Sequence, residues 1–448
     1  MTILKLLVSL LILSSFSFIQ GQDLKDQIDS YVESYVNTGD FSGCILIEEG
    51  GEVIYKSCFG YANASFKVEN TTETKFKIGS VSKQFTATAI LLLQQDSRLK
   101  LSDTLSNFFP NYPVARNITI EHLLTHTSGL IDVYSVKDFN KLTCENMSIS
   151  ELSEMVLSNE TLFDPGSQYQ YSNGGYAVLA ALIEKLSGMK YQDFMVKRIF
   201  KPLNMGSSGH AMVNEVLEGL AEGYDPSGYD GVKRTDLLDP ELLKGSGSLY
   251  SSVTDLLNWV NSIRDRKLLS SASYDMLLND YGHSYGLGIS VYSSFENEVF
   301  GHDGRVNGYI ADYLHYVDRN MSIIVLGNIQ TGVSDFFRAD IASMLFEKEY
   351  SSSAKNTPHD LKTKIDYKDI LGVYSFGPNF KVYVELIDDV LHARANEGGA
   401  SEIVLLEDGS YFSRTLYSYI EFVPTEDGEI SKMVWTNNDG VSFEGLKD

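Results

Sequence analysis

Apolar and polar positions alternate along this chain with two different periods. Apolar residues spaced three and four apart predict helices, and strict alternation predicts strands. The expected helices span residues 23–36, 80–95, 251–262 and 335–346. The expected strands of the first 350 residues span residues 44–48, 53–58, 285–291, 309–316 and 322–326. Because Gly50 and Gly51 lie between the first two strands, we expect these two to form a hairpin.

The pattern changes after residue 350. Residues 351–365 are polar, include Pro358 and show no period, so we expect a linker there. Short alternating strands follow at residues 381–386, 390–394, 403–406, 420–423 and 432–435. Turns rich in Gly and Asp separate them, which predicts a small all-β domain, a barrel or a sandwich, over residues 366–448. The first domain would then cover residues 22–350.

The first 21 residues carry a single charge, Lys5, followed by an apolar stretch from Leu6 to Ile19. A basic start and a short apolar stretch are typical of a secretory signal, whereas a membrane span needs about 20 apolar residues. We therefore expect residues 1–21 to be a signal peptide. The mature protein would be secreted or periplasmic and would have no membrane span.

Charge and cysteine content narrow the function classes. The 448 residues include 36 Lys and Arg against 60 Asp and Glu, a formal net charge of −24. Such a surface repels phosphate groups, so we expect no nucleic-acid partner and no binding to anionic lipid. Cys44 and Cys58 fall on the two hairpin strands, where a bridge and two buried thiols remain equal alternatives, and Cys144 is left over.

Ser80 and Lys83 are the first candidates for chemistry. On a helix, residues three apart share one face, so the amine would lie close enough to take the serine proton. Burial lowers an amine pKa, and the N-terminus of a helix favours negative charge on the serine oxygen. The same spacing also occurs at Ser97, Ser187 and Ser352, so it does not by itself single out Ser80.

Two further elements follow Ser80 in chain order. Tyr171 and Asn173 stand two residues apart before an apolar run, and residues 301–305 read Gly-His-Asp-Gly-Arg ahead of the expected strand 309–316. Residues 123–130, Leu-Leu-Thr-His-Thr-Ser-Gly-Leu, lie between the first two elements. Together these segments resemble the serine β-lactamase and penicillin-binding-protein superfamily. Within it they are most similar to the branch of class C β-lactamases, D,D-peptidases, D-aminopeptidases and related esterases.

The resemblance covers about residues 25–350 and implies an α/β fold, in which helices flank an antiparallel sheet beside a mainly helical subdomain. It implies that Ser80 is the acylated nucleophile and that Lys83 takes its proton. Tyr171 would relay a proton to the leaving group and later help to activate water. Asn173 would hold Lys83 and the substrate amide through hydrogen bonds.

The third element would lie on a strand that edges the cleft, with His302 and Gly304 on it. The backbone N–H groups of Ser80 and Arg305 would form the oxyanion hole. Superfamily members that bind a substrate carboxylate commonly carry lysine where His302 stands, and histidine is only partly charged near pH 7. Arg305 could supply a bidentate carboxylate contact in its place.

Other features of the chain have fewer consequences. His122 and His126 have a spacing seen in zinc sites, but the glutamate of that motif is missing, so we expect neither metal nor cofactor. The resemblance makes His126 part of a structural loop near the site. The C-terminal domain resembles the lipocalin-like modules attached to some members of this superfamily, which implies a role beside the cleft or in self-association.

The sequence thus predicts an exported serine hydrolase that forms an acyl-enzyme with small peptide, amide or ester substrates. A D,D-peptidase or D-aminopeptidase and an esterase remain alternatives within this prediction, and a β-lactamase is a further one. From another class, a non-catalytic receptor for cell-wall peptides or penicillin remains. Intact Ser80, Lys83 and Tyr171 argue against it, because a receptor has no need of them.

Arg305 gives a first prediction. If its guanidinium binds a substrate carboxylate, Arg305→Ala should lower kcat/KM more for substrates with a free carboxylate than for neutral esters. Steady-state kinetics on a matched pair of substrates measures the difference. Equal losses on both would rule the contact out.

Overall fold

The computed structural model describes residues 24–136, 139, 147–212, 215–350, 355–358, 366–396, 398–438 and 440–448. These residues form two compact units, which we describe separately. The first unit holds residues 43–223 and 235–328, and the second holds the described residues up to 42, residues 224–234 and those from 329 onward. The expected signal peptide, most of the expected linker and Cys144 lie outside the described residues.

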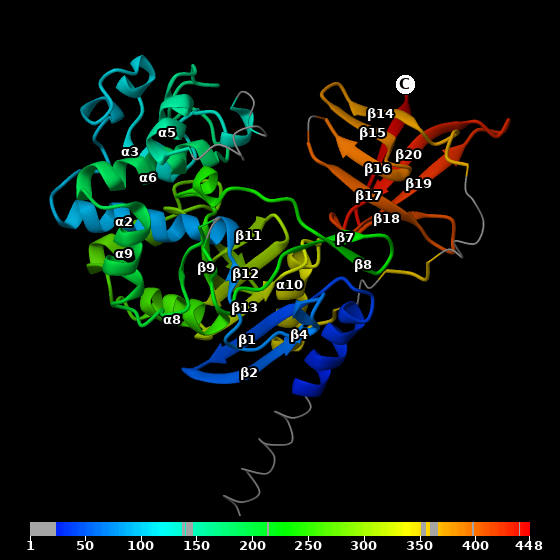
Figure 1. The fold of residues 1–448 in the computed structure, drawn as a ribbon, viewed down its shortest axis with the longest axis horizontal. Helices are drawn as coiled ribbons and strands as arrows, with labels where there is room; N and C mark the ends of the chain where they lie inside the picture. The colour runs from blue at the N-terminus through cyan, green and yellow to red at the C-terminus, as the bar shows by residue number, and fades with distance from the viewer. Residues whose placement is uncertain are drawn as a thin grey trace, which may run out of the picture. The chain divides into compact units, whose positions relative to one another are not determined.

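A six-stranded antiparallel sheet forms the centre of the first unit (Figure 1). Its strand order is β10-β11-β12-β13-β1-β2. The bounds are β1 Gly43–Glu49, β2 Glu52–Phe59, β10 Ser290–Ser294, β11 Asn297–Val306, β12 Tyr309–Tyr316 and β13 Met321–Gly327. Every residue of β12 and β13 is buried, so both faces of these strands are covered. Helix α8 (Val253–Arg264) packs against β1 and β13.

The pairing of β1 with β13 joins segments that are almost 300 residues apart in the chain. Gly43 lies opposite Gly327 at one end of this pair, and Glu49 lies opposite Met321 at the other. On its other side β1 forms the expected hairpin with β2, in which Cys44 lies directly opposite Cys58. A disulfide joins these two cysteines, which decides between the alternatives that the sequence left open.

Helices make up most of the rest of the first unit. Their bounds are α2 Ser82–Gln95, α3 Ile120–Leu124, α5 Ile149–Leu157, α6 Asn173–Ser187, α7 Tyr191–Met195 and α9 Ser271–Leu278. Helix α2 is buried from Ser82 to Leu93 because α6, α7 and α9 surround it. Among the described residues, no helix is long and apolar enough to cross a membrane. The expected α/β fold with a helical part is confirmed.

One expected strand is wrong in most of its length. Residues 285–291 alternate between apolar and polar positions, but the strand β10 begins only at Ser290. Residues before it form turns, in which Gly288 has a φ of +72°. A Cβ atom on Gly288 would lie 2.8 Å from the carbonyl oxygen of Lys83. The alternation therefore reflects a loop that is buried against α2 rather than a strand.

The second unit contains a closed antiparallel barrel, which confirms the expected all-β domain. Its strands are β14 Gly372–Gly377, β15 Phe380–Ile387, β16 Val390–Ala395, β17 Ala400–Leu405, β18 Tyr411–Ser413, β19 Ser418–Pro424, β20 Ile430–Thr436 and β21 Ser442–Lys447. The sequence missed β14, β18 and β21. Strand β18 has three residues, which is too short for alternation to show, and β14 has a glycine at each end.

The same unit includes the helix at residues 24–36, helix α10 (Ser334–Leu345) and a hairpin of β7 (Tyr224–Ser227) and β8 (Gly231–Arg234). Tyr35 packs on Phe337 of α10 at 4.8 Å between ring centroids.

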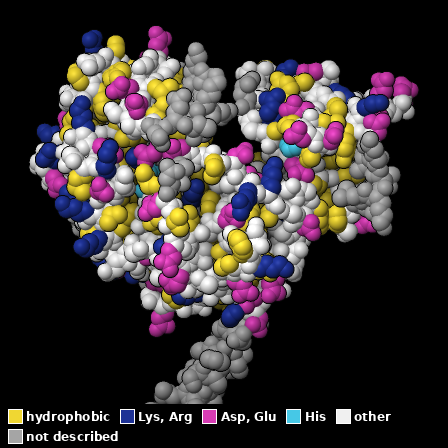
Figure 2. All heavy atoms as spheres, in the orientation of Figure 1, with side chains coloured by type: hydrophobic (Ala, Val, Ile, Leu, Met, Phe, Trp, Pro, Cys, Tyr) yellow, Lys and Arg dark blue, Asp and Glu magenta, His cyan; other side chains and the backbone are white. Residues whose placement is uncertain are grey.

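In the view of Figure 2, acidic side chains are interspersed with basic ones and no single basic patch stands out.

A buried ion cluster ties distant segments of the second unit together. The side chain of Asp40 has no exposed surface and accepts hydrogen bonds from Arg414 Nε at 2.6 Å and Lys355 Nζ at 2.9 Å. Tyr417 donates to the same carboxylate at 3.2 Å. Arg414 also donates to the carbonyl oxygen of Gly231, so one arginine links the barrel, the N-terminal segment and β8.

This cluster gives a prediction about stability. Asp40→Asn should lower the free energy of unfolding of the second unit by about 3–5 kcal/mol, because two buried cations then lack a counter-charge. Denaturant titration of both variants measures the change. The control is Asp29→Asn, which breaks an exposed pair with Lys25 and should have a far smaller effect. Equal effects of the two changes would contradict the prediction.

Candidate active site

Ser80 and Lys83 lie where a short 3₁₀ turn, η1 (Gly79–Val81), leads into α2. Strand β9 (Leu249–Ser251) fixes this entry, because Ile78 N donates to Leu249 O and Leu249 N donates to Ser82 Oγ. The side chain of Lys83 is fully buried, whereas Ser80 stays partly exposed. The Nζ atom of Lys83 lies 3.0 Å from Ser80 Oγ, as the spacing predicted.

The amine of Lys83 has three polar neighbours. Besides Ser80 Oγ, these are Asn173 Oδ1 at 2.8 Å and the carbonyl oxygen of Ser246 at 2.9 Å. Burial lowers the pKa of Lys83 to about 7, although the negative charges of Asp132 and Asp303 oppose this shift. A neutral amine has two hydrogens and one lone pair. Since the two carbonyl oxygens accept both hydrogens, the lone pair is directed at the Ser80 hydroxyl.

Tyr171 stands immediately before α6, whose first residue is Asn173. Its ring centroid lies 4.6 Å from Lys83 Nζ, and the neighbouring Ser80 side chain acts to lower the pKa of Tyr171. Burial raises the pKa of Tyr171 well above its usual value, so the phenol keeps its proton near pH 7. Ser172 caps α6 by accepting from Gly175 N, and this cap holds Tyr171 and Asn173 at the helix start.

Asp132 sets the direction of the Asn173 amide. One carboxylate oxygen, Oδ2, accepts from Asn173 N at 2.7 Å and from Asn173 Nδ2 at 3.0 Å. A carboxylate accepts only, so the amide must present Nδ2 to Asp132 and Oδ1 to Lys83. Neither Asp132 nor the Ser246 carbonyl was predicted from the sequence. The only signal for Asp132 in the sequence is its proximity to the 123–130 segment, and a main-chain carbonyl has no sequence signature.

The third sequence motif, residues 301–305, lies on β11 where this strand passes η1. Strand β10 pairs with β11 only from Asn297 to Gly301, so the next residues of β11 are not covered by β10. A Cβ atom on Gly79 would lie 2.7 Å from Arg305 N, and one on Gly304 would lie 3.0 Å from Ser80 N. Both glycines are thus needed for the close approach of η1 and β11, which places the main chain at Ser80 beside the main chain at Arg305.

His302 is buried on β11 and lies beside the same group of residues. Its Nε2 atom lies 3.0 Å from the hydroxyl of Tyr285, which in turn lies 3.3 Å from His126 Nε2. The ring of His126 packs on the ring of Tyr171 at 4.1 Å between centroids. The structure therefore brings all seven residues expected from the sequence to one place and adds Asp132, Ser246 and Tyr285.

No group of three or more His, Cys, Asp or Glu side chains within the described part of the chain is arranged to hold a metal ion. His122 and His126 face different partners, since Thr119 N donates to His122 Nδ1 and Ser172 N donates to His126 Nδ1. The i, i+4 spacing of these histidines therefore reflects two separate structural contacts.

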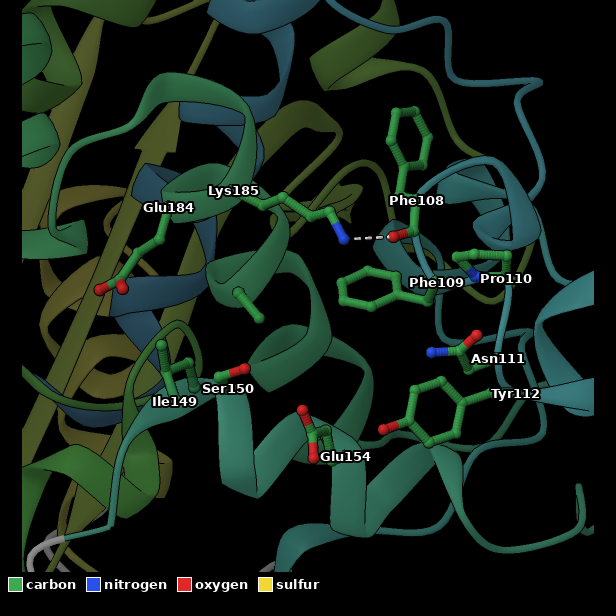
Figure 3. Close-up of a pocket in the computed structure, with 11 residues that line it drawn as sticks. Phe108, Phe109, Pro110, Asn111, Tyr112, Ile149, Ser150, Glu154, Glu184 and Lys185 are labelled. Carbon is green, nitrogen blue, oxygen red and sulfur yellow. Dashed lines mark hydrogen bonds between the residues drawn. The ribbon is translucent and has the colours of Figure 1, made fainter.

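A separate hollow of about 450 Å³ lies between α5, α6 and residues 108–112 (Figure 3). Lys185 points into it and donates to the carbonyl oxygen of Phe108, with its amine 5.1 Å from the ring centroid of Phe109. Ser80, Lys83 and Tyr171 do not line this hollow. It is therefore distinct from the candidate active site.

A family model described as Beta-lactamase matches residues 28–346. This chain belongs to the Beta-lactamase family. The match spans the first unit together with adjoining parts of the second and confirms the resemblance that the motifs indicated. Among curated relatives, Penicillin-binding protein 4* of Bacillus subtilis is 28% identical over 457 residues, covering 95% of this chain and 99% of that protein. Putative penicillin-binding protein PbpX of the same organism is 31% identical, over 58% of this chain and 64% of that protein.

Solved structures of family relatives share the fold. D-amino acid amidase from Ochrobactrum anthropi is 23% identical with a TM-score of 0.63, covering 72% of this chain and 96% of that one. The octameric penicillin-binding protein homologue from Pyrococcus abyssi is 22% identical with a TM-score of 0.62, covering 94% of this chain and 99% of that one. The second likeness extends over the C-terminal barrel as well.

The contacts of Lys83 give a third prediction, with covalent labelling of Ser80 by a fluorophosphonate as the measurement. Asn173→Ala removes one acceptor and should slow labelling by about tenfold, or roughly 1.4 kcal/mol. Asp132→Asn removes a negative charge that raises the pKa of Lys83, so the rise of the labelling rate should move to lower pH. The control is Asp164→Asn, at an exposed carboxylate before Tyr171, which should leave the pH profile unchanged. Identical profiles for Asp132→Asn and wild type would contradict the prediction.

Proposed function

We propose that this protein is an exported serine hydrolase that acts on peptide, amide or ester substrates through a covalent acyl-enzyme. The observation that carries the proposal is the buried Lys83 amine, 3.0 Å from Ser80 Oγ and with a pKa lowered to about 7. A lysine in this state is an effective base at neutral pH, whereas an ordinary lysine is protonated there. A lysine with a purely structural role would not need the Ser80 hydroxyl as a partner in addition to Asn173 and the Ser246 carbonyl.

The first step follows from the direction of the Lys83 lone pair. Lys83 takes the proton of Ser80, and the serine oxygen attacks the carbonyl carbon of the substrate. The negative charge that develops on the carbonyl oxygen meets the N–H groups of Ser80 and Arg305, where η1 and β11 approach each other. Such a donor contributes on the order of 3–4 kcal/mol to lowering the barrier.

Tyr171 carries the proton onward. Because the pKa of its phenol is raised, Tyr171 is protonated when the tetrahedral intermediate forms and can donate to the leaving nitrogen or oxygen. Lys83, now charged, passes its extra proton to the Tyr171 oxygen, so that the acyl-enzyme again has a neutral amine and a protonated phenol. In deacylation, the same groups act in the opposite direction. A water molecule takes the place of the leaving group and loses its proton as it attacks the acyl carbon.

The substrate class follows in part from the relatives. Penicillin-binding proteins and a D-amino acid amidase are among the proteins that this chain resembles, which favours D-amino-acid peptides or amides over simple esters. Burial lowers the pKa of His302, so the third element lacks the fixed cation that a carboxylate clamp needs. A β-lactamase activity is therefore the less favoured alternative, and a non-catalytic penicillin-binding receptor is the alternative from another class.

Mass spectrometry tests the proposal. Wild type and Ser80→Ala are treated separately with a fluorophosphonate and with penicillin, and the adducts are mapped. Labelling of Ser80 by the fluorophosphonate alone is expected for a peptidase or esterase, and labelling by both reagents would indicate the penicillin-recognising branch. Labelling by neither would contradict the proposal and favour a receptor.

The pH dependence follows from Lys83. Below pH 7 the amine is protonated and cannot take the serine proton, so kcat/KM should rise with pH through about 7. Lys83→Met should lower kcat/KM by about 10²–10⁴-fold and abolish this rise. A rate that is independent of pH between 5 and 9, on any substrate that acylates Ser80, would exclude Lys83 as the base.

A further inference from the structure

Three buried side chains beside Lys83 form a hydrogen-bonded chain that the mechanism above does not use. It runs from His126 through the hydroxyl of Tyr285 to Nε2 of His302. His126 and His302 expose 1% and 5% of their surface, and Tyr285 exposes 4%. Groups so well removed from water depend on one another and on their protein neighbours for their hydrogen bonds.

The direction of this chain is fixed at both ends. Ser172 N–H donates to His126 Nδ1 at 3.1 Å, so the neutral ring of His126 carries its hydrogen on Nε2 and donates to Tyr285. The Tyr285 hydroxyl then donates to His302 Nε2. At the other end, His302 Nδ1 lies against the carbonyl oxygen of Asp303, which can only accept. His302 is therefore neutral, with Nδ1 as donor and Nε2 as acceptor.

A second proton on His302 would break this arrangement. Tyr285 would face an N–H group from each histidine, and its own hydroxyl would lose the acceptor it has now. The groups that face His302 are Asp303 on its own strand, Lys83 on α2, Tyr285 on the loop before β10 and, beyond Tyr285, His126 on the loop after α3. Burial and the charge of Lys83 lower the pKa of His302, and Asp303 only partly opposes them.

Asp303 is the neighbour of His302 in the third element, and its side chain is 69% exposed. One of its carboxylate oxygens lies 3.9 Å from His302 Nδ1. Its negative charge raises the pKa of both Lys83 and Tyr171, so Asp303 lies within electrostatic reach of the reacting groups. The third element therefore presents a carboxylate beside a neutral imidazole, where a lysine would present a cation.

We propose that Asp303 makes this element an anionic subsite for substrates with an ammonium group, and that Tyr285 is the positioning residue that keeps His302 uncharged. An amino-acid amide or a peptide with a free N-terminus fits this subsite, because its ammonium nitrogen is two bonds from the carbonyl carbon that Ser80 attacks. The inference rests on the proposed function and narrows its substrates from acyl compounds in general to those with a free amine.

The test compares three p-nitroanilides of D-alanine that differ only in the charge on the amine: free, N-acetylated and N-succinylated. At pH 7 and low salt, wild type should prefer the free amine to the neutral acetyl compound, and the succinyl carboxylate should be worst. Asp303→Asn should lower the ratio of kcat/KM for the free amine to that for the acetyl compound by about three- to fivefold, as for a partly exposed charge pair. Salt should lower the wild-type ratio in the same direction. Any change at Lys83 acts on all three compounds alike, so the ratio isolates the subsite.

Tyr285→Phe removes only the hydroxyl and tests the positioning role. The titration of His302, followed by NMR in protein labelled at histidine, should move to higher pH, because the neutral ring loses its donor. Below pH 7 the preference for the free amine should then fall, since a charged His302 offsets Asp303. The control is Tyr191→Phe, which removes another buried tyrosine hydroxyl, one bonded to Thr86, and should leave the titration of His302 in place.

A preference for the succinyl compound that disappears in Arg305→Ala would overturn the proposal, because the subsite would then be cationic. Equal losses on all three compounds in Asp303→Asn would also overturn it. Calorimetric binding of the same compounds to Ser80→Ala and the NMR titration need no turnover. If Ser80 is not acylated, but calorimetry shows the expected charge preference and NMR the expected shift of the His302 titration, only the proposed function fails.

Discussion

The local structure of this site depends on where the hydrogens of one buried amine go. Within the described part of the chain, Lys83 has no carboxylate in hydrogen-bond contact, and its two nearest acceptors, Asn173 Oδ1 and the Ser246 carbonyl, are uncharged. Burial without a contacting counter-charge lowers the pKa, and two neutral acceptors occupy both hydrogens of the deprotonated form. What remains is a lone pair that faces Ser80. Had either acceptor been a carboxylate, the amine would be charged and could not act as a base.

The rest of the first unit serves to hold that arrangement. Asp132 lies one contact further out, where it fixes the Asn173 amide without touching Lys83. Gly79 and Gly304 let η1 and β11 approach closely, so that the main chain at Ser80 lies beside the main chain at Arg305. The sheet and α2 meet in one hydrophobic core, so these backbone positions are set by packing rather than by the side chains that react.

Charged side chains in this site lie further from the reacting Ser80–Lys83 pair than neutral groups do. The groups in contact with the reacting pair are neutral near pH 7, and the carboxylates of Asp132 and Asp303 act from further away. The chain from His126 to His302 extends the same principle, since each member can donate in one direction only while all stay uncharged. A neutral interior with a carboxylate at its edge differs from a site built to hold an anion.

The sequence by itself determined the elements whose cause is local. The periods of the chain predicted α2, β12, β13 and the Cys44–Cys58 hairpin, because periodicity and turn residues act within a few positions. The Ser80–Lys83 spacing determined that the two side chains share a helix face. Tertiary structure alone decided that residues 285–289 are a buried loop and that Asp132, Ser246 and Tyr285 belong to the site. These contacts join segments 17 to 163 residues apart, and no pattern within one segment carries the geometry of another.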